Sequence, residues 1–143
     1  MTEEAAQIII VEDNAYDAEI ILQGFQQYNP LLRAKVLTDG HEALRHIPAV
    51  CADTRVRSYL RLVLLDLKLP KVHGLEVLRQ LRAEQHTKDL PIVVFTSSLD
   101  EKDKIESYNH GANDYVVKPV GFAEFMEVVG RIYKTWIEGN RQE

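Results

Sequence analysis

Three short runs of this sequence, Ile8–Val11, Leu62–Leu65 and Ile92–Phe95, are apolar throughout. A strand that is apolar on both sides is covered on both faces, which is typical of a parallel sheet between two layers of helices. Two mixed runs, Ala34–Leu37 and Tyr115–Val117, suit the less covered edges of such a sheet. The pattern therefore predicts an α/β fold with a mostly parallel sheet of five strands.

Amphipathic segments fill the gaps between these strands. Apolar residues recur at helical spacing from Ala15 to Phe25, and Asn14 is placed to cap that helix. Five helices are predicted in all, around residues 15–25, 41–47, 75–81, 101–110 and 122–137. The segment from Pro48 to Leu60 is predicted to be a connection, with no role that the sequence reveals.

Length and composition exclude several classes of protein. The 143 residues suit a single domain, residues 1–143, and the single cysteine, Cys51, can form neither an internal disulfide nor a sulfur-rich zinc site. The net charge is −5 and no Lys/Arg cluster resembles a nucleic-acid footprint, so direct binding to nucleic acid is not expected. The N-terminus lacks a signal peptide, and no apolar run approaches the ~20 residues of a membrane span. We therefore expect a cytoplasmic protein.

Polar residues follow four of the five predicted strands, at the point where each strand ends. They are Glu12 and Asp13, Asp66, Thr96 and Lys118. Right-handed crossovers keep parallel strands pointing the same way, so these residues should emerge at one edge of the sheet. That carboxyl edge is where open α/β sheets bind ligands. The sequence therefore predicts three carboxylates, a hydroxyl and an ammonium in one cluster.

This set of residue types suits phosphoryl transfer. Clustered carboxylates repel one another unless a cation intervenes, and oxygen ligands favour Mg²⁺ over zinc. An aspartate beside Mg²⁺ can attack a phosphoryl group, while a lysine spreads charge on the phosphoryl oxygens and the hydroxyl of Thr96 donates to one of them. Taken singly, Asp66 has an ordinary structural explanation as a turn or cap residue, and so has the pair Glu12 and Asp13 as a helix opener. Their placement at successive strand ends favours a site.

Four segments resemble response-regulator receiver domains, the phosphorylatable half of bacterial two-component signalling. They are VEDN (11–14), LLDLKLP (64–70), VVFTS (93–97) and GANDYVVKP (111–119). The resemblance implies a doubly wound, flavodoxin-like sheet of order 2-1-3-4-5. It also implies a cis peptide bond before Pro119, a phosphoacceptor switch rather than an enzyme, and a histidine kinase as phosphoryl donor.

The resemblance also assigns roles. Asp66 is implied as the phosphoacceptor, with Thr96, Lys118 and Tyr115 as switch hydroxyl, phosphate-binding lysine and aromatic switch. Mg²⁺, for which Mn²⁺ can substitute, is the implied metal. Its implied site consists of the acidic pair Glu12 and Asp13 together with Asp66 and the backbone carbonyl of Lys68.

Three features narrow the resemblance to stand-alone regulators that pair with bacterial phytochrome kinases: the TSS triplet at 96–98, the late Trp136 and the lack of an output domain. The last helix, at about 24 Å, should outrun strands of about 17 Å and expose Tyr133, Trp136 and Ile137. We therefore predict a homodimer through this helix. The alternative is that Trp136 folds back over the first helix.

The main rival function is an aspartate-nucleophile phosphatase of the haloacid dehalogenase kind. Such enzymes carry a second aspartate two residues after the first, and here that position is Lys68. They also need additional chain for a substrate cap. A nucleotide-binding function has less support, because the sequence contains neither GxGxxG nor GxxxxGK[ST].

Overall fold

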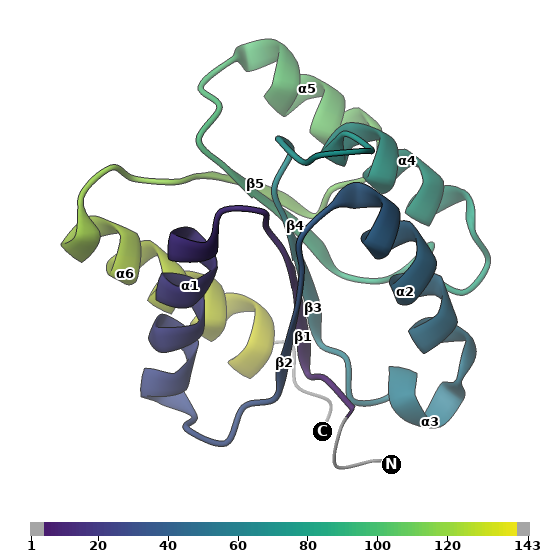
Figure 1. Cartoon of the computed structure of the whole chain (residues 1–143), viewed down its shortest axis with the longest axis horizontal. Coiled ribbons are helices and arrows are strands. Elements are labelled where there is room, and N and C mark those ends of the chain that lie inside the picture. Colours follow the sequence, from purple (N-terminus) through teal and green to yellow (C-terminus); the bar gives the residue numbers. More distant parts are fainter. Residues whose placement is uncertain (1–4, 140–143) are drawn as a thin grey trace.

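The computed structural model describes residues 5–139, in which five parallel strands form one sheet of order β2-β1-β3-β4-β5 (Figure 1). The strands are β1 (Ile8–Val11), β2 (Ala34–Leu37), β3 (Leu62–Leu65), β4 (Ile92–Thr96) and β5 (Asp114–Val117). The three central strands are buried along their whole length, whereas the edge strands β2 and β5 are partly exposed. The predicted fold class and strand order are confirmed, and β4 ends and β5 begins one residue outside the predicted range.

Helices cover both faces of the sheet. They are α1 (Ala15–Tyr28), α2 (Gly40–Ala52), α3 (Thr54–Arg57), α4 (Gly74–Ala83), α5 (Glu101–Asn109) and α6 (Phe122–Ile132), and α6 continues as a π-helical segment, η2 (Tyr133–Glu138). Helices α1 and α6 lie together on one face, and α2, α4 and α5 lie on the other (Figure 1). No helix within residues 5–139 is long and apolar enough to cross a membrane.

The side chains of the central strands alternate between two separate cores. Along β1, Ile9 and Val11 pack with α2 and α4, whereas Ile8 and Ile10 pack with α1 and α6. Strands β3 and β4 alternate in the same way. Each fully buried aliphatic side chain contributes about 1.5–3 kcal/mol, so both faces must be apolar. This explains the unbroken apolar runs in the sequence.

The predicted connection from Pro48 to Leu60 is helical over most of its length, which corrects the sequence prediction. Helix α2 continues through Pro48 to Ala52, and the short α3 follows at once. Asp53 ends α2 and caps α3, because its carboxylate accepts the backbone N–H groups of residues 55 and 56 at 3.1 and 3.4 Å. Cys51 and Leu60 are buried in the core on this face. Tertiary burial has therefore outweighed the helix-breaking tendency of Pro48.

The peptide bond before Pro119 is trans, and all other peptide bonds in the described part of the chain are trans as well. The cis bond implied by the sequence resemblance is therefore not found. The trans form is the more stable state of an X-Pro bond, by about 0.5–1 kcal/mol. The backbone N–H of Lys118 nevertheless bonds the carbonyl of Thr96 at 2.8 Å, so the lysine leaves the sheet beside β4.

A close backbone approach fixes the loop that follows β3. Gly74 opens α4 directly against the backbone of Asp66 and Leu67, and its N–H donates to the carbonyl of Leu67 at 2.8 Å. A Cβ atom at this position would collide with the carbonyl oxygen of Asp66. The glycine therefore lets α4 begin close enough to hold the backbone of Asp66 at the sheet edge.

Candidate functional site

The carboxyl edge of the sheet brings together the residues that follow β1, β3 and β5. Parallel pairing in register places Val11 beside Leu65, so Glu12 and Asp66 emerge next to each other. The ammonium of Lys118 donates to Glu12 Oε1 at 2.6 Å and to Asp66 Oδ2 at 2.9 Å. The structure therefore joins three of the predicted site residues directly.

These charged groups are withdrawn from water. The side chains of Lys118 and Asp66 are each 7% exposed and that of Glu12 is 3% exposed. Burial and the neighbouring Asp66 raise the pKa of Glu12 to about 7, against the opposing effect of Lys118. Burial alone lowers the pKa of Lys118, but its hydrogen bonds to the surrounding carboxylates outweigh burial and raise it. Lys118 therefore remains a cation at neutral pH.

Three carboxylates at this edge can hold a divalent cation. One oxygen each from Glu12, Asp13 and Asp66 lies within 4.8 Å of the others, and Asp13 is exposed while the other two are buried. All three donors are carboxylate oxygens, and the exposed side leaves room for water, which fits Mg²⁺ or Mn²⁺. The backbone N–H of Lys68 donates to Asp66 Oδ1 at 3.3 Å, and the role of its carbonyl as a ligand remains a prediction.

Thr96 and Tyr115 lie close to the cluster and are linked through Ser98. Thr96 is fully buried at the end of β4, and its hydroxyl oxygen accepts the backbone N–H of Ser98 at 3.4 Å. The hydroxyl of Tyr115 donates to the carbonyl of Ser98 at 3.0 Å, with the ring buried in the core. Burial raises the pKa of Tyr115, so it remains a proton donor. The two residues predicted to act as a switch therefore meet on one backbone segment.

Sequence reasoning missed one residue of this site, Asp17. Its carboxylate accepts the third hydrogen bond of the Lys118 ammonium, at 2.9 Å. The available signal was its spacing from Asn14, because an acid three residues after a helix cap lies on the first turn and faces the strand ends. That signal indicates a helix start equally well, so it did not single out Asp17.

The predicted overhang of the last helix is not found. Tyr133 and Ile137 are buried, and the ring of Tyr133 stacks on Tyr28 of α1 at 5.0 Å between centroids. The geometric prediction compared the last helix with the strands alone, whereas α1 is itself 14 residues long and continues beside α6. The alternative, that Trp136 folds back over the first helix, is wrong about the place of this residue: Trp136 packs against the core on this face but lies beside β5.

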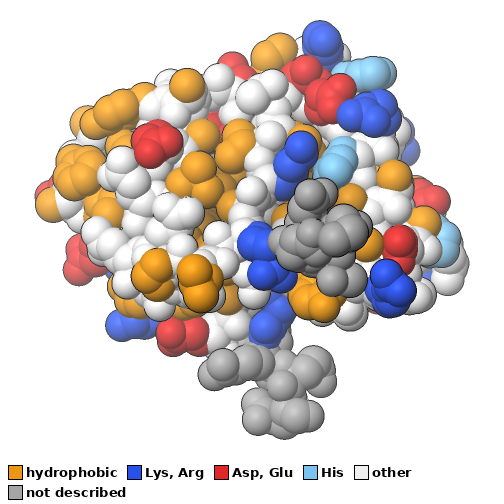
Figure 2. Space-filling view, turned by 60° about the horizontal axis from the view of Figure 1, so that its bottom comes forward, with side chains coloured by type: hydrophobic (Ala, Val, Ile, Leu, Met, Phe, Trp, Pro, Cys, Tyr) orange, Lys and Arg blue, Asp and Glu red, His pale blue; other side chains and the backbone are white. Residues whose placement is uncertain are grey.

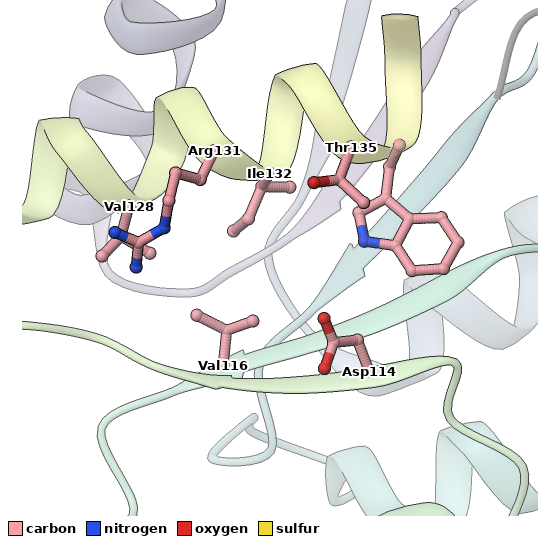
Figure 3. A pocket seen from close by; sticks show the side chains of 7 residues that line it. Asp114, Val116, Val128, Arg131, Ile132 and Thr135 are labelled. Carbon is pink, nitrogen blue, oxygen red and sulfur yellow. The ribbon is translucent and has the colours of Figure 1, made fainter. Parts of the chain in front are cut away.

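Trp136 lies instead over β5, in a groove between α6 and that edge strand. Trp136 lines this groove together with Asp114, and Figure 3 shows Val116 and Arg131 farther along it. The groove combines an apolar floor with one acidic and one basic side chain. The last helix therefore meets solvent along this groove, on the side that faces β5.

Comparison with protein families gives one clear match. A family model described as the response regulator receiver domain matches residues 8–130. The probable methanogenesis regulatory protein FilR2 of Methanothrix harundinacea is 36% identical over 134 residues, which cover 94% of this chain and 85% of FilR2. The response regulator ArlR of Staphylococcus aureus is 32% identical over 90% of this chain, which spans only 52% of ArlR.

Two solved structures have the same fold over almost their whole length. The phosphorylated cyanobacterial phytochrome response regulator RcpA gives a TM-score of 0.81 at 28% identity, covering 96% of this chain and 98% of RcpA. The Mn²⁺-bound form of the response regulator Rcp1 gives 0.81 at 29% identity, covering 95% and 97%. Neither these structures nor the relatives support the phosphatase alternative.

Proposed function

The chain belongs to the response regulator receiver domain family, and we propose that Asp66 is the residue on which it accepts a phosphoryl group. Receiver domains of this family take that group from a histidine kinase and act as phosphoacceptor switches. The observation that carries the proposal is the hydrogen bond between the Lys118 ammonium and the buried Asp66 carboxylate, beside two further acids.

The arrangement suits attack by Asp66 on phosphorus. A carboxylate oxygen of Asp66 forms the new bond to phosphorus, and the bond from phosphorus to the donor's imidazole nitrogen, or to an oxygen in a small phosphodonor, breaks in the same displacement. Lys118 is held within hydrogen-bond reach of Asp66, so its charge lies where the phosphoryl oxygens arrive. Mg²⁺, held by Asp13, Asp66 and Glu12, would offset the repulsion between these acids and the incoming dianion.

We propose that the signal leaves the site through Thr96. A charged phosphoryl oxygen on Asp66 is a stronger hydrogen-bond acceptor for the Thr96 hydroxyl than a neutral group is. Movement of Thr96 toward that oxygen changes its bond to Ser98, whose carbonyl holds Tyr115 in the core. The aromatic ring is then free to change its position, which alters the surface beside β5 and α5.

Phosphorylation with a small donor tests the assignment of Asp66. We expect incubation with acetyl phosphate and Mg²⁺ to add one phosphoryl group to the intact chain, and to add none to Asp66→Asn or in excess chelator. Glu19→Gln, which removes one exposed acid from α1, is the control and should be phosphorylated like the wild type. Unchanged modification of Asp66→Asn would show that another residue is the acceptor.

The partner that we propose is a histidine kinase with a phytochrome photosensor. The support is the likeness to RcpA, a phytochrome response regulator, over 96% of this chain. Phosphotransfer from a radiolabelled phytochrome kinase should be faster than from a histidine kinase that has no phytochrome domain. Equal transfer from both kinases would leave the family assignment intact but would refute the phytochrome pairing.

We also propose that the chain forms a homodimer through its last helix, by the groove beside β5. The support is that β5 is an edge strand and that the groove offers an acid, Asp114, and a base, Arg131, which two copies related by a two-fold axis can pair reciprocally. Sedimentation velocity at micromolar concentration should show a dimer for wild type and a monomer for Arg131→Glu. A monomeric wild type, with and without phosphorylation, would contradict this.

A further inference from the structure

We infer that Asp17 is a positioning residue that holds Lys118 in its resting place and competes with the phosphoryl group for it. This inference rests on the proposed function, because it concerns the regulation of the same site. The ammonium of a lysine has three N–H donors. In the structure they go to Glu12 at 2.6 Å, to Asp17 at 2.9 Å and to Asp66 at 2.9 Å.

The contact between Asp17 and Lys118 belongs to a closed ring of hydrogen bonds. The second oxygen of Glu12 accepts the backbone N–H of Asn14 at 3.1 Å, and the side-chain oxygen of Asn14 accepts the backbone N–H of Asp17 at 3.0 Å. Lys118 closes the ring by bonding both carboxylates. The cap of α1 therefore also fixes the position of the Asp17 carboxylate.

All three donors of Lys118 are already used before a phosphoryl group arrives. A phosphoryl group on Asp66 brings several new charged acceptor oxygens. The donor that now bonds the Asp66 carboxylate can turn to one of them, but a second bond from Lys118 requires the release of another partner. Of the two partners that are not phosphorylated, Asp17 is the more easily released, because its side chain is 22% exposed and water can replace the lysine there, whereas Glu12 is 3% exposed. The Asp17 contact is therefore the one that opposes phosphoryl binding.

Removal of the Asp17 carboxylate frees one N–H of Lys118 for the phosphoryl group, so a phosphoryl mimic should bind more tightly. If Asp17 had only a structural role, its removal would disturb the start of α1, and the phosphoryl mimic would bind more weakly. The direction of the change therefore distinguishes a positioning residue from a structural one.

Beryllofluoride, an unreactive phosphoryl mimic, provides the test in the full chain with Mg²⁺. We expect Asp17→Ala to lower its dissociation constant about three- to tenfold, the net effect of about one ordinary hydrogen bond. Glu19→Gln removes the same charge from the same helix, but Glu19 is exposed and bonds Gln23 rather than Lys118, so its dissociation constant should stay within twofold of wild type. Asp17→Glu, which keeps the carboxylate, should bind more like the wild type than Asp17→Ala does.

A second measurement follows the lysine itself, without metal. The ¹³Cε resonance of Lys118 should move in Asp17→Ala and stay in place in Glu19→Gln. Equal or weaker beryllofluoride binding by Asp17→Ala, or equal tightening by Glu19→Gln, would overturn the inference while leaving the phosphoacceptor assignment standing. Failure of beryllofluoride to bind the wild type at all would instead refute the proposed function.

Discussion

Charged side chains gather at both ends of the parallel strands, but they are bonded in different ways. At the carboxyl edge, Glu12, Asp66 and Lys118 bond one another and are almost fully buried. At the amino edge, the partly exposed guanidinium groups of Arg33 and Arg61 donate to the backbone carbonyls of residues 5 and 137, at 2.7 and 3.2 Å. Figure 2, turned so that this end comes forward, shows a column of Lys and Arg side chains there.

The difference separates structural charges from functional ones. A partly exposed guanidinium that bonds a neutral carbonyl keeps much of its hydration and ties chain segments together. A buried charge loses its hydration, which costs several kcal/mol for each ion. Contact with an opposite charge offsets this cost only when every hydrogen-bond partner is in place. The carboxyl edge is also the ligand-binding edge of such sheets. Burial of charge at this edge, rather than the number of charges, identifies the site.

Loss of Lys118 should produce the largest effect on stability. Lys118→Met leaves the buried carboxylates of Glu12 and Asp66 without their cation, which we expect to lower the free energy of unfolding by roughly 3 kcal/mol in chelator. Saturating Mg²⁺ should restore part of it, because the metal replaces the lost charge. Urea denaturation with and without Mg²⁺ measures both values. Equal loss in both conditions would show that the lysine acts only through packing.

An effect of similar size should appear in the pH dependence of the metal-free chain. Since the folded pKa of Glu12 is raised to about 7 from 4.5, the folded state holds more protons than the unfolded state between these values. Stability therefore falls as pH rises through this window, by up to about 1.4 kcal/mol for each pH unit. Glu12→Gln should remove this fall in thermal or urea unfolding scans from pH 4.5 to 7.5. A slope that persists in the variant would assign it to other groups.

A smaller effect should follow from cutting the link between the site and its surroundings. Thr96→Ala retains Asp66 and Lys118, so we expect its beryllofluoride dissociation constant to change by less than about tenfold, the value of one hydrogen bond. The Tyr115 ring resonances should no longer change when beryllofluoride binds, because the Thr96 hydroxyl that connects the site to Ser98 and Tyr115 is gone. Identical ring shifts in wild type and variant would refute the coupling.

The amino edge should give the smallest effect. Arg61→Gln removes a partly exposed contact with a neutral carbonyl, so we expect at most about 1 kcal/mol of destabilisation and no change in phosphorylation by acetyl phosphate. Urea unfolding and intact mass check the two halves of this statement. A loss as large as that of Lys118→Met would mean that the two edges do not differ as described.

The sequence was most informative where a buried strand ends on a charge. Continuous apolar runs identified the central strands, and their shared direction sufficed to place Glu12, Asp66 and Lys118 together. Two features depended on packing between helices, which spacing along one helix does not reveal. Tyr133 is buried because α1 extends beside it, and Pro48 lies inside a helix because the residues around it are buried. Asp17 could not be singled out from the sequence, because an acid that only favours the first turn of a helix has the same spacing as one that also bonds Lys118.

The central claim is that a phosphoryl group is received at the carboxyl edge, and amide NMR with beryllofluoride and Mg²⁺ tests it most directly. The largest shifts should fall on residues that follow the strands, including Asp13, Leu67 and Ser97, while Gln7 and Arg61 at the amino edge remain unchanged. Asp66→Asn should show none of these shifts. Shifts concentrated at the amino edge, or the same shifts in Asp66→Asn, would contradict the account.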